Sequence, residues 1–304
     1  MPLSPNFRGA LFMALAMMSF TTNDTMVKLL SETMPMGQIV FMRNLIASVV
    51  IILIAYRQHA LRPIRLAFSP YIVIRIIGEV GGTVTFLIGL SHIPIGNASA
   101  ILQALPLAVT MGAALFLGEP VGWRRWSAIL VGFLGVLVII RPGVEGFSPY
   151  ALIVAITVLF AAGRDIATRK IDPSIPPLFI SSLTAPAVAI AGLFLDPPTS
   201  GEWVSVGLWE LTLLIGAASL VLTAYHFIIH AMREGDISFI APFRYSSLMV
   251  AILFGYLIFG DIPDIYIVTG ALMIVASGLY TIYREKVRID AGPVAASSTT
   301  RPSP

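Results

Sequence analysis

Ten apolar segments run along this chain, and the Lys and Arg residues between them gather on one side. A helix needs about 20 apolar residues to cross a lipid bilayer, and each segment is close to that length. We therefore predict an all-α membrane protein with ten transmembrane helices. The helices are expected at residues 9–30, 36–56, 70–91, 94–117, 123–140, 148–169, 178–195, 208–231, 237–259 and 263–283.

The composition indicates that lipid is the solvent of this chain. Of its 304 residues, 57% are hydrophobic and only 12% are charged, whereas about a quarter of the residues in a soluble domain are charged. Cysteine is absent, which excludes disulfide and thiol chemistry. No nucleic-acid-binding module is visible, so we expect no nucleic acid as a partner. Only Arg8 supplies positive charge before the first segment, which favours an uncleaved span over a signal peptide.

The basic residues predict the orientation. With a cytoplasmic N-terminus, the cytoplasmic segments hold 13 of the 19 Lys and Arg residues, five lie within spans, and the outer loops hold only Arg141. Because cytoplasmic loops of membrane proteins are enriched in Lys and Arg, both termini are predicted to be cytoplasmic. The 13 residues are Arg8, Arg57, Arg62, Arg65, Arg124, Arg125, Arg169, Lys170, Arg233, Arg284, Lys286, Arg288 and Arg301.

The second half of the chain echoes the first. The stretch Ile95-Gly-Asn-Ala-Ser99 matches Glu234-Gly-Asp-Ile-Ser238 at an offset of 139, and Leu117-Gly-Glu-Pro120 matches Phe259-Gly-Asp-Ile262 at an offset of 142. Since five is an odd number, a second five-helix unit would enter the membrane from the opposite face, as in the inverted repeats of secondary transporters. Chance similarity between apolar helices is the alternative.

The predicted organisation therefore has three parts. The first repeat is expected at residues 1–143 and the second at 144–288. Residues 289–304 are rich in Ala, Ser, Thr and Pro and are predicted to form a disordered cytoplasmic tail.

At the matching turns the chain resembles the drug/metabolite transporter superfamily, specifically its EamA type with two five-helix repeats. The motifs are Leu117-Gly-Glu119, its counterpart Phe259-Gly-Asp261, and the run from Gly132 to Gly143 that closes the first repeat. The resemblance covers about residues 8–285. It implies a secondary transporter that moves a small organic solute across the bacterial inner membrane by alternating access, without a cofactor.

The resemblance also suggests a substrate. The stretches 4–13, 20–24 and 37–44 are similar to an alphaproteobacterial group that includes riboflavin importers. Aromatic amino-acid exporters carry Leu-Trp-Ser in the first span, where this chain has Met18-Ser-Phe-Thr21. Riboflavin uptake is therefore the specific expectation, and export of an amino acid or related metabolite is the alternative.

Other functional classes have little support. No Walker motif is present, so the chain itself supplies no ATP coupling. Zinc-protease, Ser/His/Asp and Gly-x-Gly-Asp arrangements are also missing, which leaves an intramembrane enzyme as a remote alternative. His226 and His230, four residues apart, lack a third ligand, so we expect ordinary hydrogen-bonded histidines rather than a metal site. The expected partners are the solute and the bilayer, and the sequence leaves room for a homodimer.

Charged residues within the spans are candidate gates, because a charge at bilayer depth is costly unless it faces a cavity or a partner. Asp24 and Arg43 fall at similar depth in the outer half of the first two spans. Asp165 and Arg244 fall in the inner third of the sixth and ninth spans. Each set is interpreted as an ion pair that closes one face, with helix packing as the alternative.

A central cavity is expected near mid-depth. Glu79 is a candidate coupling carboxylate, with an intrahelical pair to Arg75 as the alternative. Pro106 and Pro242 are expected to interrupt the fourth and ninth helices. Aromatic rings would stack on a flat solute, and polar side chains would bond its edge. The candidate cavity residues are Phe20, Glu79, Thr83, Phe86, Gln103, Phe160, Tyr225 and Tyr245.

Overall fold

The structure is a computed structural model, and it describes residues 4–119, 121–143, 146–234 and 237–290. Within these residues it contains helices and no strands, which confirms the all-α prediction. The helices are α1 (Pro5–Leu30), α2 (Met36–Arg57), η1 (Ile64–Phe68), α3 (Pro70–His92), α4 (Ile95–Leu102), α5 (Leu105–Phe116), α6 (Trp123–Ile140), α7 (Pro149–Thr168), α8 (Pro177–Leu195), η2 (Pro198–Ser200), α9 (Leu208–Glu234), α10 (Ile237–Ile240), η3 (Ala241–Tyr245), α11 (Ser246–Phe259) and α12 (Ile265–Asp290).

Nine helical segments within the described residues are long and apolar enough to cross a membrane. They correspond to the second through tenth predicted spans. The first, α1, has 26 residues, but the polar run from Thr21 to Asp24 lowers its mean hydropathy. Much of α1 is nevertheless buried, from Met13 through Asn23 to Val27. A tenth crossing by α1 therefore stays a prediction.

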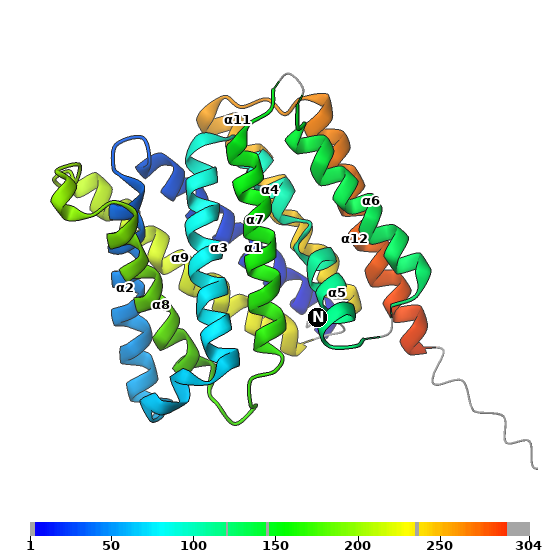
Figure 1. Cartoon of the computed structure of the whole chain (residues 1–304), viewed down its shortest axis with the longest axis horizontal. Helices are drawn as coiled ribbons and strands as arrows, with labels where there is room; N and C mark the ends of the chain where they lie inside the picture. Colours follow the sequence, from blue (N-terminus) through cyan, green and yellow to red (C-terminus); the bar gives the residue numbers. More distant parts are fainter. Residues whose placement is uncertain (1–3, 120, 144–145, 235–236, 291–304) are drawn as a thin grey trace, which may run out of the picture.

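The two halves of the chain are interleaved. Helix α1 packs along α9, α3 along α7, α2 along α8 and α6 along α12. Figure 1 shows α3 beside α7 at the front, with α1 crossing behind them. Exchanging α1 for α7, α2 for α8, α3 for α9 and α6 for α12 returns the same four pairs. An inverted repeat would produce this pairing, although the repeat itself stays a prediction.

The fourth and ninth predicted spans are both interrupted. Helix α4 ends at Leu102, and α5 begins at Leu105, after Gln103 and Ala104, with Pro106 at its second residue. In the ninth span, the 3-10 turn η3 contains Pro242 and separates α10 from α11. Proline lacks an N–H and its ring clashes with the preceding turn, so a helix is broken or kinked there.

The turns after these two spans have the same construction. Gly118 and Gly260 have φ angles of +68° and +70°, a left-handed conformation that glycine adopts without a steric penalty. The next N–H then bonds back six residues, from Glu119 to Ala113 O at 3.3 Å and from Asp261 to Gly255 O at 2.9 Å. Both helices thus end at a left-handed glycine followed by a backbone hydrogen bond that returns to the last turns of the helix. The two turns are 142 residues apart, as in the sequence echo.

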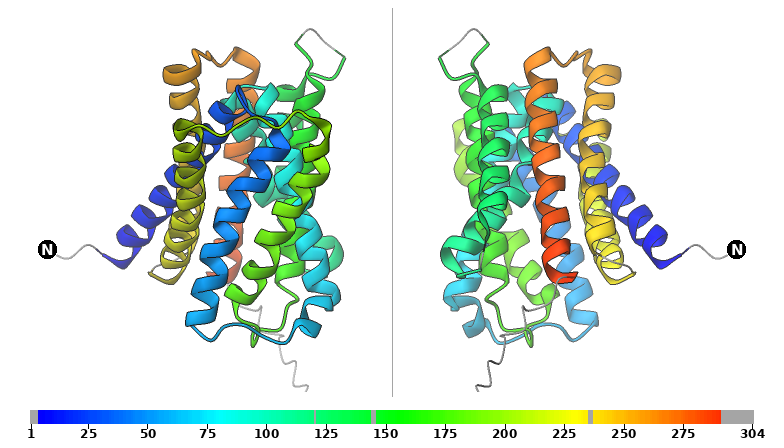
Figure 2. Two further views of the ribbon diagram at one scale, coloured as in Figure 1. Left: turned by 90° about the vertical axis from the view of Figure 1, so that its left-hand side faces the viewer. Right: turned by 90° about the vertical axis from the view of Figure 1, so that its right-hand side faces the viewer.

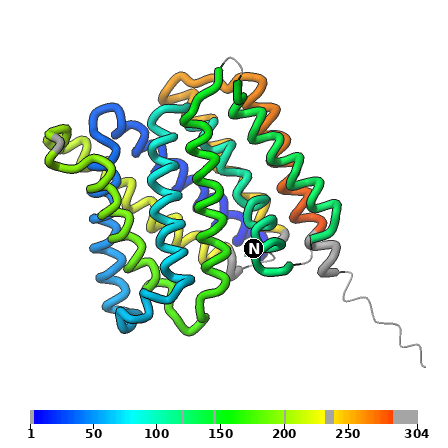
Figure 3. The backbone as a smooth tube through the Cα atoms, in the orientation of Figure 1, coloured from blue at the N-terminus to red at the C-terminus, as the bar shows by residue number. Residues whose placement is uncertain are grey.

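The basic connections lie at one end of the bundle. Figures 1 and 3 place the α2–α3, α5–α6 and α7–α8 connections at the same end as the start of α1. Arg62 and Lys170 are exposed there, whereas Arg141 lies at the opposite end. We call the end that carries Arg62 and Lys170 the basic end. Its location in the cytoplasm stays a prediction. The predicted tail at 289–304 lies outside the described residues apart from Ile289 and Asp290, which continue α12.

Candidate substrate site and gate residues

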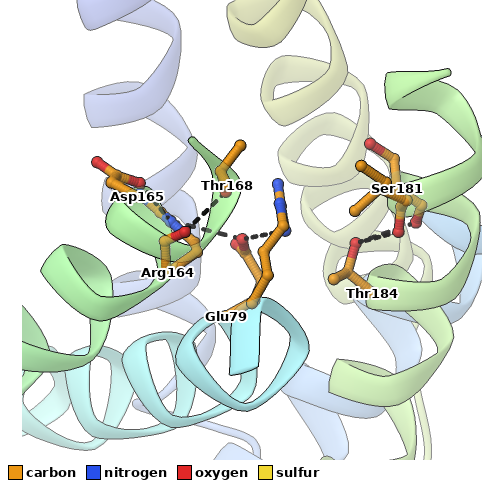
Figure 4. A network of polar contacts seen from close by, with 8 residues as sticks. Glu79, Arg164, Asp165, Thr168, Ser181 and Thr184 are labelled. Atoms are coloured by element: carbon orange, nitrogen blue, oxygen red, sulfur yellow. Dashed lines mark hydrogen bonds and ion pairs between the residues drawn. The ribbon is translucent and has the colours of Figure 1, made fainter. Parts of the chain in front are cut away.

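Glu79 of α3 lies between two arginines. Its Oε2 is 3.4 Å from Arg75 Nη1, one turn earlier on α3, and 3.5 Å from Arg164 Nη1 on α7. Arg164 also donates from Nε to Asp165 Oδ1 at 2.8 Å. Figure 4 shows Glu79, Arg164 and Asp165 turned toward one another between the two helices. The intrahelical pair with Arg75 is therefore present, and Arg164 adds an interhelical contact to the same carboxylate, while a coupling role for Glu79 stays a prediction.

Close packing of α3 on α7 makes this contact possible. Gly78 has no side chain, and a Cβ placed there would lie 2.8 Å from the carbonyl oxygen of Phe160 and from Cβ of Arg164. Small residues allow helix backbones to approach within membranes. About two turns further along α3, the hydroxyls of Thr85 and Thr157 are 2.8 Å apart and also link the two helices. Neither threonine was among the predicted site residues, although hydroxyl residues in facing spans are the sequence signal for such a pair.

The cluster around Glu79 is partly accessible and loosely bonded. The side chains of Glu79 and Arg164 are 17% and 25% exposed. Hydrogen bonds between ammonium-type nitrogens and carboxylates are usually about 2.7–2.9 Å long, so contacts of 3.4 and 3.5 Å are long. One carboxylate divided between two guanidinium groups can therefore exchange partners when another charged group arrives.

Asp24 and Arg43 form a second cluster, in which Asn23 is the link. Arg43 Nη1 donates to Asn23 Oδ1 at 3.3 Å, and Asn23 Nδ2 donates to Asp24 Oδ1 at 2.9 Å. Asp24 and Arg43 also interact electrostatically, but they make no direct ion pair. The predicted direct contact is thus replaced by an amide, which can accept from the guanidinium and donate to the carboxylate simultaneously. Asn23 was missing from the predicted site.

The predicted Asp165–Arg244 bridge is not closed in this structure. Asp165 accepts its hydrogen bond from the adjacent Arg164. Arg244, on η3, is exposed and interacts with Asp165 only electrostatically, at more than ion-pair distance. An adjacent guanidinium on the same helix is the nearer partner for the carboxylate. The gating role of both pairs stays a prediction.

Tyr225 of α9 lies between the two clusters. Its hydroxyl interacts electrostatically with Glu79, Arg164 and Arg43. Its ring meets Phe20 of α1 edge-on, with 5.3 Å between the ring centroids. Tyr225 is 43% exposed, so this aromatic pair keeps accessible surface next to the charges. The structure therefore brings two predicted cavity residues, Phe20 and Tyr225, into contact.

The other predicted aromatic residues take part in helix packing. Phe86 is buried in the hydrophobic core. The ring of Phe160 covers Gly81, where an added Cβ would lie 2.6 Å from the ring. Tyr245 is also buried, and its hydroxyl lies against Gly278 of α12. In this structure their rings thus pack against neighbouring helices.

The predicted polar residues near mid-depth differ in their contacts. Gln103, at the break between α4 and α5, donates from Nε2 to Ser247 Oγ of α11 at 2.7 Å. This hydrogen bond joins the two interrupted spans. Thr21 of α1 donates to the carbonyl oxygen of Ser247 at 3.4 Å. Thr83 is partly buried on α3.

His226 and His230 lie together, with their ring centroids 4.5 Å apart. Phe12 of α1 is 5.5 Å from the ring of His230. Nowhere in the described residues do three or more His, Cys, Asp or Glu side chains form a group that could hold a metal ion. The imidazoles contact an aromatic ring and each other.

Comparisons with known proteins agree with this architecture. Residues 7–141 match the EamA-like transporter family. A solved structure described as "Crystal structure of protein" shares the fold with a TM-score of 0.61 and 17% identity, over 92% of this chain and 98% of that chain.

Three curated relatives match along most of their length. The S-adenosylmethionine uptake transporter of Rickettsia bellii is 28% identical, over 90% of this chain and 92% of that protein. The pseudopaline exporter CntI of Pseudomonas aeruginosa is 29% identical, over 88% and 94%. The riboflavin transporter of Vibrio cholerae is 28% identical, over 89% and 91%. The family match over residues 7–141 and these relatives, all named as transporters, support the EamA type of the drug/metabolite transporter superfamily and a membrane transporter rather than an enzyme.

Proposed function

We propose that this chain is a secondary transporter for a small solute that carries an α-amino acid group and a flat heteroaromatic ring, with S-adenosylmethionine as the specific candidate. The observation that carries the proposal is the position of Glu79, divided between arginines of two helices beside an accessible aromatic pair. Transport would cross the bacterial inner membrane by alternating access.

The charges favour a zwitterionic solute over a neutral one. Ionisable side chains within a membrane are costly and usually belong to a transport pathway. A substrate carboxylate would bind Arg164 in place of Glu79, and the released Glu79 would receive the substrate ammonium group. The spans contain side chains of both positive and negative charge, four arginines and three acids: Arg43, Arg75, Arg164, Arg244, Asp24, Glu79 and Asp165.

The aromatic pair would bind the ring. Adenine has a flat face that can stack on Tyr225 or meet the edge of Phe20. Both side chains adjoin the charged clusters, so one solute could contact ring and charges together. The family relative in Rickettsia bellii is named for S-adenosylmethionine uptake, which supports this choice.

Riboflavin uptake is the second candidate. Its three-ring system would fit the same Phe20–Tyr225 pair, and the relative in Vibrio cholerae is named a riboflavin transporter. Riboflavin is neutral, however, so it would leave the charged cluster without a substrate group to bind. We therefore rank it below the zwitterion. Export of an amino-acid-related metabolite remains the alternative for direction, since the relative in Pseudomonas aeruginosa is an exporter.

The mechanism we propose is a rocking of two inverted halves with a gate at each face. The four interleaved helix pairs and the two turns at an offset of 142 support the inverted repeat. The closed gate of this mechanism would lie at the end opposite the basic end, and two local observations support that assignment. Asn23 and Arg43 are only 3% and 7% exposed, and Lys28 Nζ of α1 donates to Leu90 O and Ile93 O at the end of α3.

Purified protein in proteoliposomes tests the substrate directly. We would measure uptake of radiolabelled S-adenosylmethionine and, in parallel, uptake of riboflavin by its fluorescence. Saturable S-adenosylmethionine uptake that excess unlabelled riboflavin does not inhibit is the expected result. Riboflavin uptake without S-adenosylmethionine uptake would reject the zwitterion and support the second candidate.

A matched pair of variants ties the activity to the site. Arg164→Gln should abolish most uptake, because it removes the guanidinium shared by Glu79 and Asp165. Arg169→Gln, near the end of the same helix region, removes a charge that pairs with Glu119 at the surface. This control should transport like the unmodified protein. Equal activity of the two variants would exclude the Glu79 cluster as the binding site.

A further inference from the structure

A groove between α6 and α12 shares no lining residue with the Glu79 cluster. Figures 1 and 2 show these two helices side by side at one edge of the bundle. The groove has a volume of about 420 Å³, within the range of roughly 300–1,000 Å³ found for small-molecule sites. From this groove we infer a binding site for an anionic phospholipid, with phosphatidylglycerol as the representative headgroup.

Small side chains form the floor of the groove. Ser127, Ala128 and Ser277 line it, where neighbouring helix positions carry large residues. The hydroxyl of Ser277 on α12 donates to the carbonyl oxygen of Ala128 on α6. The small size of these residues leaves the space open, and the interhelical hydrogen bond holds the two sides of the floor together.

The groove is charged at one end and apolar along the rest of its length. Arg124 lines it in the first turn of α6, at the basic end of the bundle. Val131 lines it two turns further along the helix, roughly 10 Å away at 1.5 Å per residue. Leu130 and Leu134, on either side of Val131 in the sequence, extend the exposed apolar surface of α6. A headgroup at Arg124 would thus place an acyl chain along α6.

The residues around Arg124 suit a phosphate group. Its guanidinium lies 5.5 Å from the ring centroid of Trp123. No ion pair joins Arg124 to a carboxylate among the side chains that the structure describes, whereas Arg169 at the same end pairs with Glu119. Guanidinium groups bind phosphate oxygens with two parallel hydrogen bonds. Basic pockets between transmembrane helices on the cytoplasmic side are typical sites for anionic lipid headgroups.

Aromatic residues place the groove at the depth of lipid headgroups. Trp123 is 75% exposed, and Tyr280 of α12 is exposed on the other wall. Trp and Tyr are enriched at the membrane–water interface, because an apolar ring and a polar N–H or O–H suit that layer. A second copy of this chain fits less well, because a two-fold axis along the membrane normal would bring two Arg124 groups into one interface.

Native mass spectrometry of the full chain in detergent tests the site. We would add phosphatidylglycerol or phosphatidylcholine with the same acyl chains and compare the lipid adducts that survive. The unmodified protein should retain phosphatidylglycerol in preference to phosphatidylcholine. Arg124→Gln should lower the retained fraction about tenfold, the effect of losing about 1.4 kcal/mol of binding free energy. Val131→Trp, which fills the groove without changing charge, should lower it as well.

A matched control separates this site from general basic charge. Arg57→Gln removes another exposed arginine at the same end and should retain phosphatidylglycerol like the unmodified protein. The inference is overturned if Arg124→Gln and Val131→Trp both bind phosphatidylglycerol normally, or if phosphatidylcholine binds equally well. A dimer that Val131→Trp dissociates, without any lipid adduct, would instead assign the groove to a second copy of this chain.

Discussion

At the scale of single residues, Glu79 has the most consequential environment in the described part of the chain. It lies within a span, contacts guanidinium groups of α3 and α7, and keeps some accessible surface. A carboxylate that only stabilised the fold would be expected to bond one partner tightly. The long contacts to two partners suggest that it takes part in an exchange with substrate.

Glu79→Gln is therefore predicted to impair transport more than folding. The amide keeps the shape and can still accept a hydrogen bond, but it loses the charge. We expect the substrate concentration for half-maximal uptake to rise about tenfold, since a hydrogen bond to a charged group contributes about 1.5–3 kcal/mol. Uptake kinetics in proteoliposomes provide the measurement, with Glu119→Gln at the surface as the control. An unchanged half-saturation value would assign Glu79 a packing role.

Asp264 combines a helix cap with an ion pair. Its Oδ1 accepts from the N–H groups of Tyr266 and Ile267 at the start of α12, at 3.0 and 2.9 Å. Its other oxygen pairs with Arg141. Burial by itself would raise the pKa of Asp264, but the bonds from Arg141 and these N–H groups lower it below the usual value.

The lowered pKa of Asp264 predicts the direction of a pH effect. Because the folded state holds the carboxylate ionised, its stabilising contribution is present above the unfolded pKa of about 3.9 and is lost as pH falls through the lower folded value. Asp264→Asn keeps the cap, so at pH 7 it should lower stability by at most about 1 kcal/mol, as Asp264 is partly exposed. Thermal unfolding in detergent should show this difference shrinking below about pH 4. A difference that grows on acidification would contradict the assignment.

At the scale of helices, glycines set the distance between α6 and α12. A Cβ on Gly270 would lie 2.5 Å from the carbonyl oxygen of Gly135, and a Cβ on Gly135 would lie 2.8 Å from that of Gly270. Real Cβ atoms do not approach a backbone oxygen so closely, so any side chain would force the helices apart. The contact between the last helices of the two halves thus depends on two residues without side chains.

Gly270→Ala is predicted to destabilise this helix pair. Overpacking typically costs about 1–3 kcal/mol, which should appear as a lower midpoint of thermal unfolding in detergent. Gly163→Ala is the matched control, because a Cβ at this position of α7 meets nothing within 4 Å. Alanine should stabilise α7 there by up to about 1 kcal/mol through helix propensity. Equal shifts in the two variants would show that the α6–α12 spacing tolerates a methyl group.

At the scale of the whole molecule, the placement of basic connections at one end predicts the orientation. Arg62 lies in the α2–α3 connection at the basic end, and Thr33 lies in the α1–α2 connection at the other; both are exposed. The chain has no cysteine, so single cysteines can be introduced without a background signal. Thr33→Cys should react with a membrane-impermeant maleimide in intact cells, and Arg62→Cys only after permeabilisation. The reverse labelling would invert the predicted topology.

Much of the architecture follows from the sequence, for identifiable reasons. Runs of about 20 apolar residues bounded by Pro, Gly and charge located the helices within a few residues, since lipid leaves the backbone no alternative to helical hydrogen bonding. The turns at Gly118 and Gly260 were also predictable from the local sequence. Pro106 and Pro242 predicted the interrupted helices. These features depend on neighbours within one turn or on the solvent.

The candidate site was only partly predictable. Charge at bilayer depth drew attention to Glu79, Asp165 and Asp24 without any knowledge of their neighbours. Their interaction partners were harder to predict, because a residue such as Asp165 has possible partners on its own helix and on other helices. The intervening Asn23 could be recognised only once α1 and α2 were packed together.

The sequence by itself determined the solvent, the helices, their turns and the family, because these depend on local apolar length, turn chemistry and recurring motifs. The tertiary structure decided which helices pair across the two halves and which charges meet. It divided Glu79 between two arginines, put Asn23 between Asp24 and Arg43, and left Arg244 apart from Asp165. Those outcomes depend on contacts between residues far apart in the chain, whose distances are set by the close approach of whole helices.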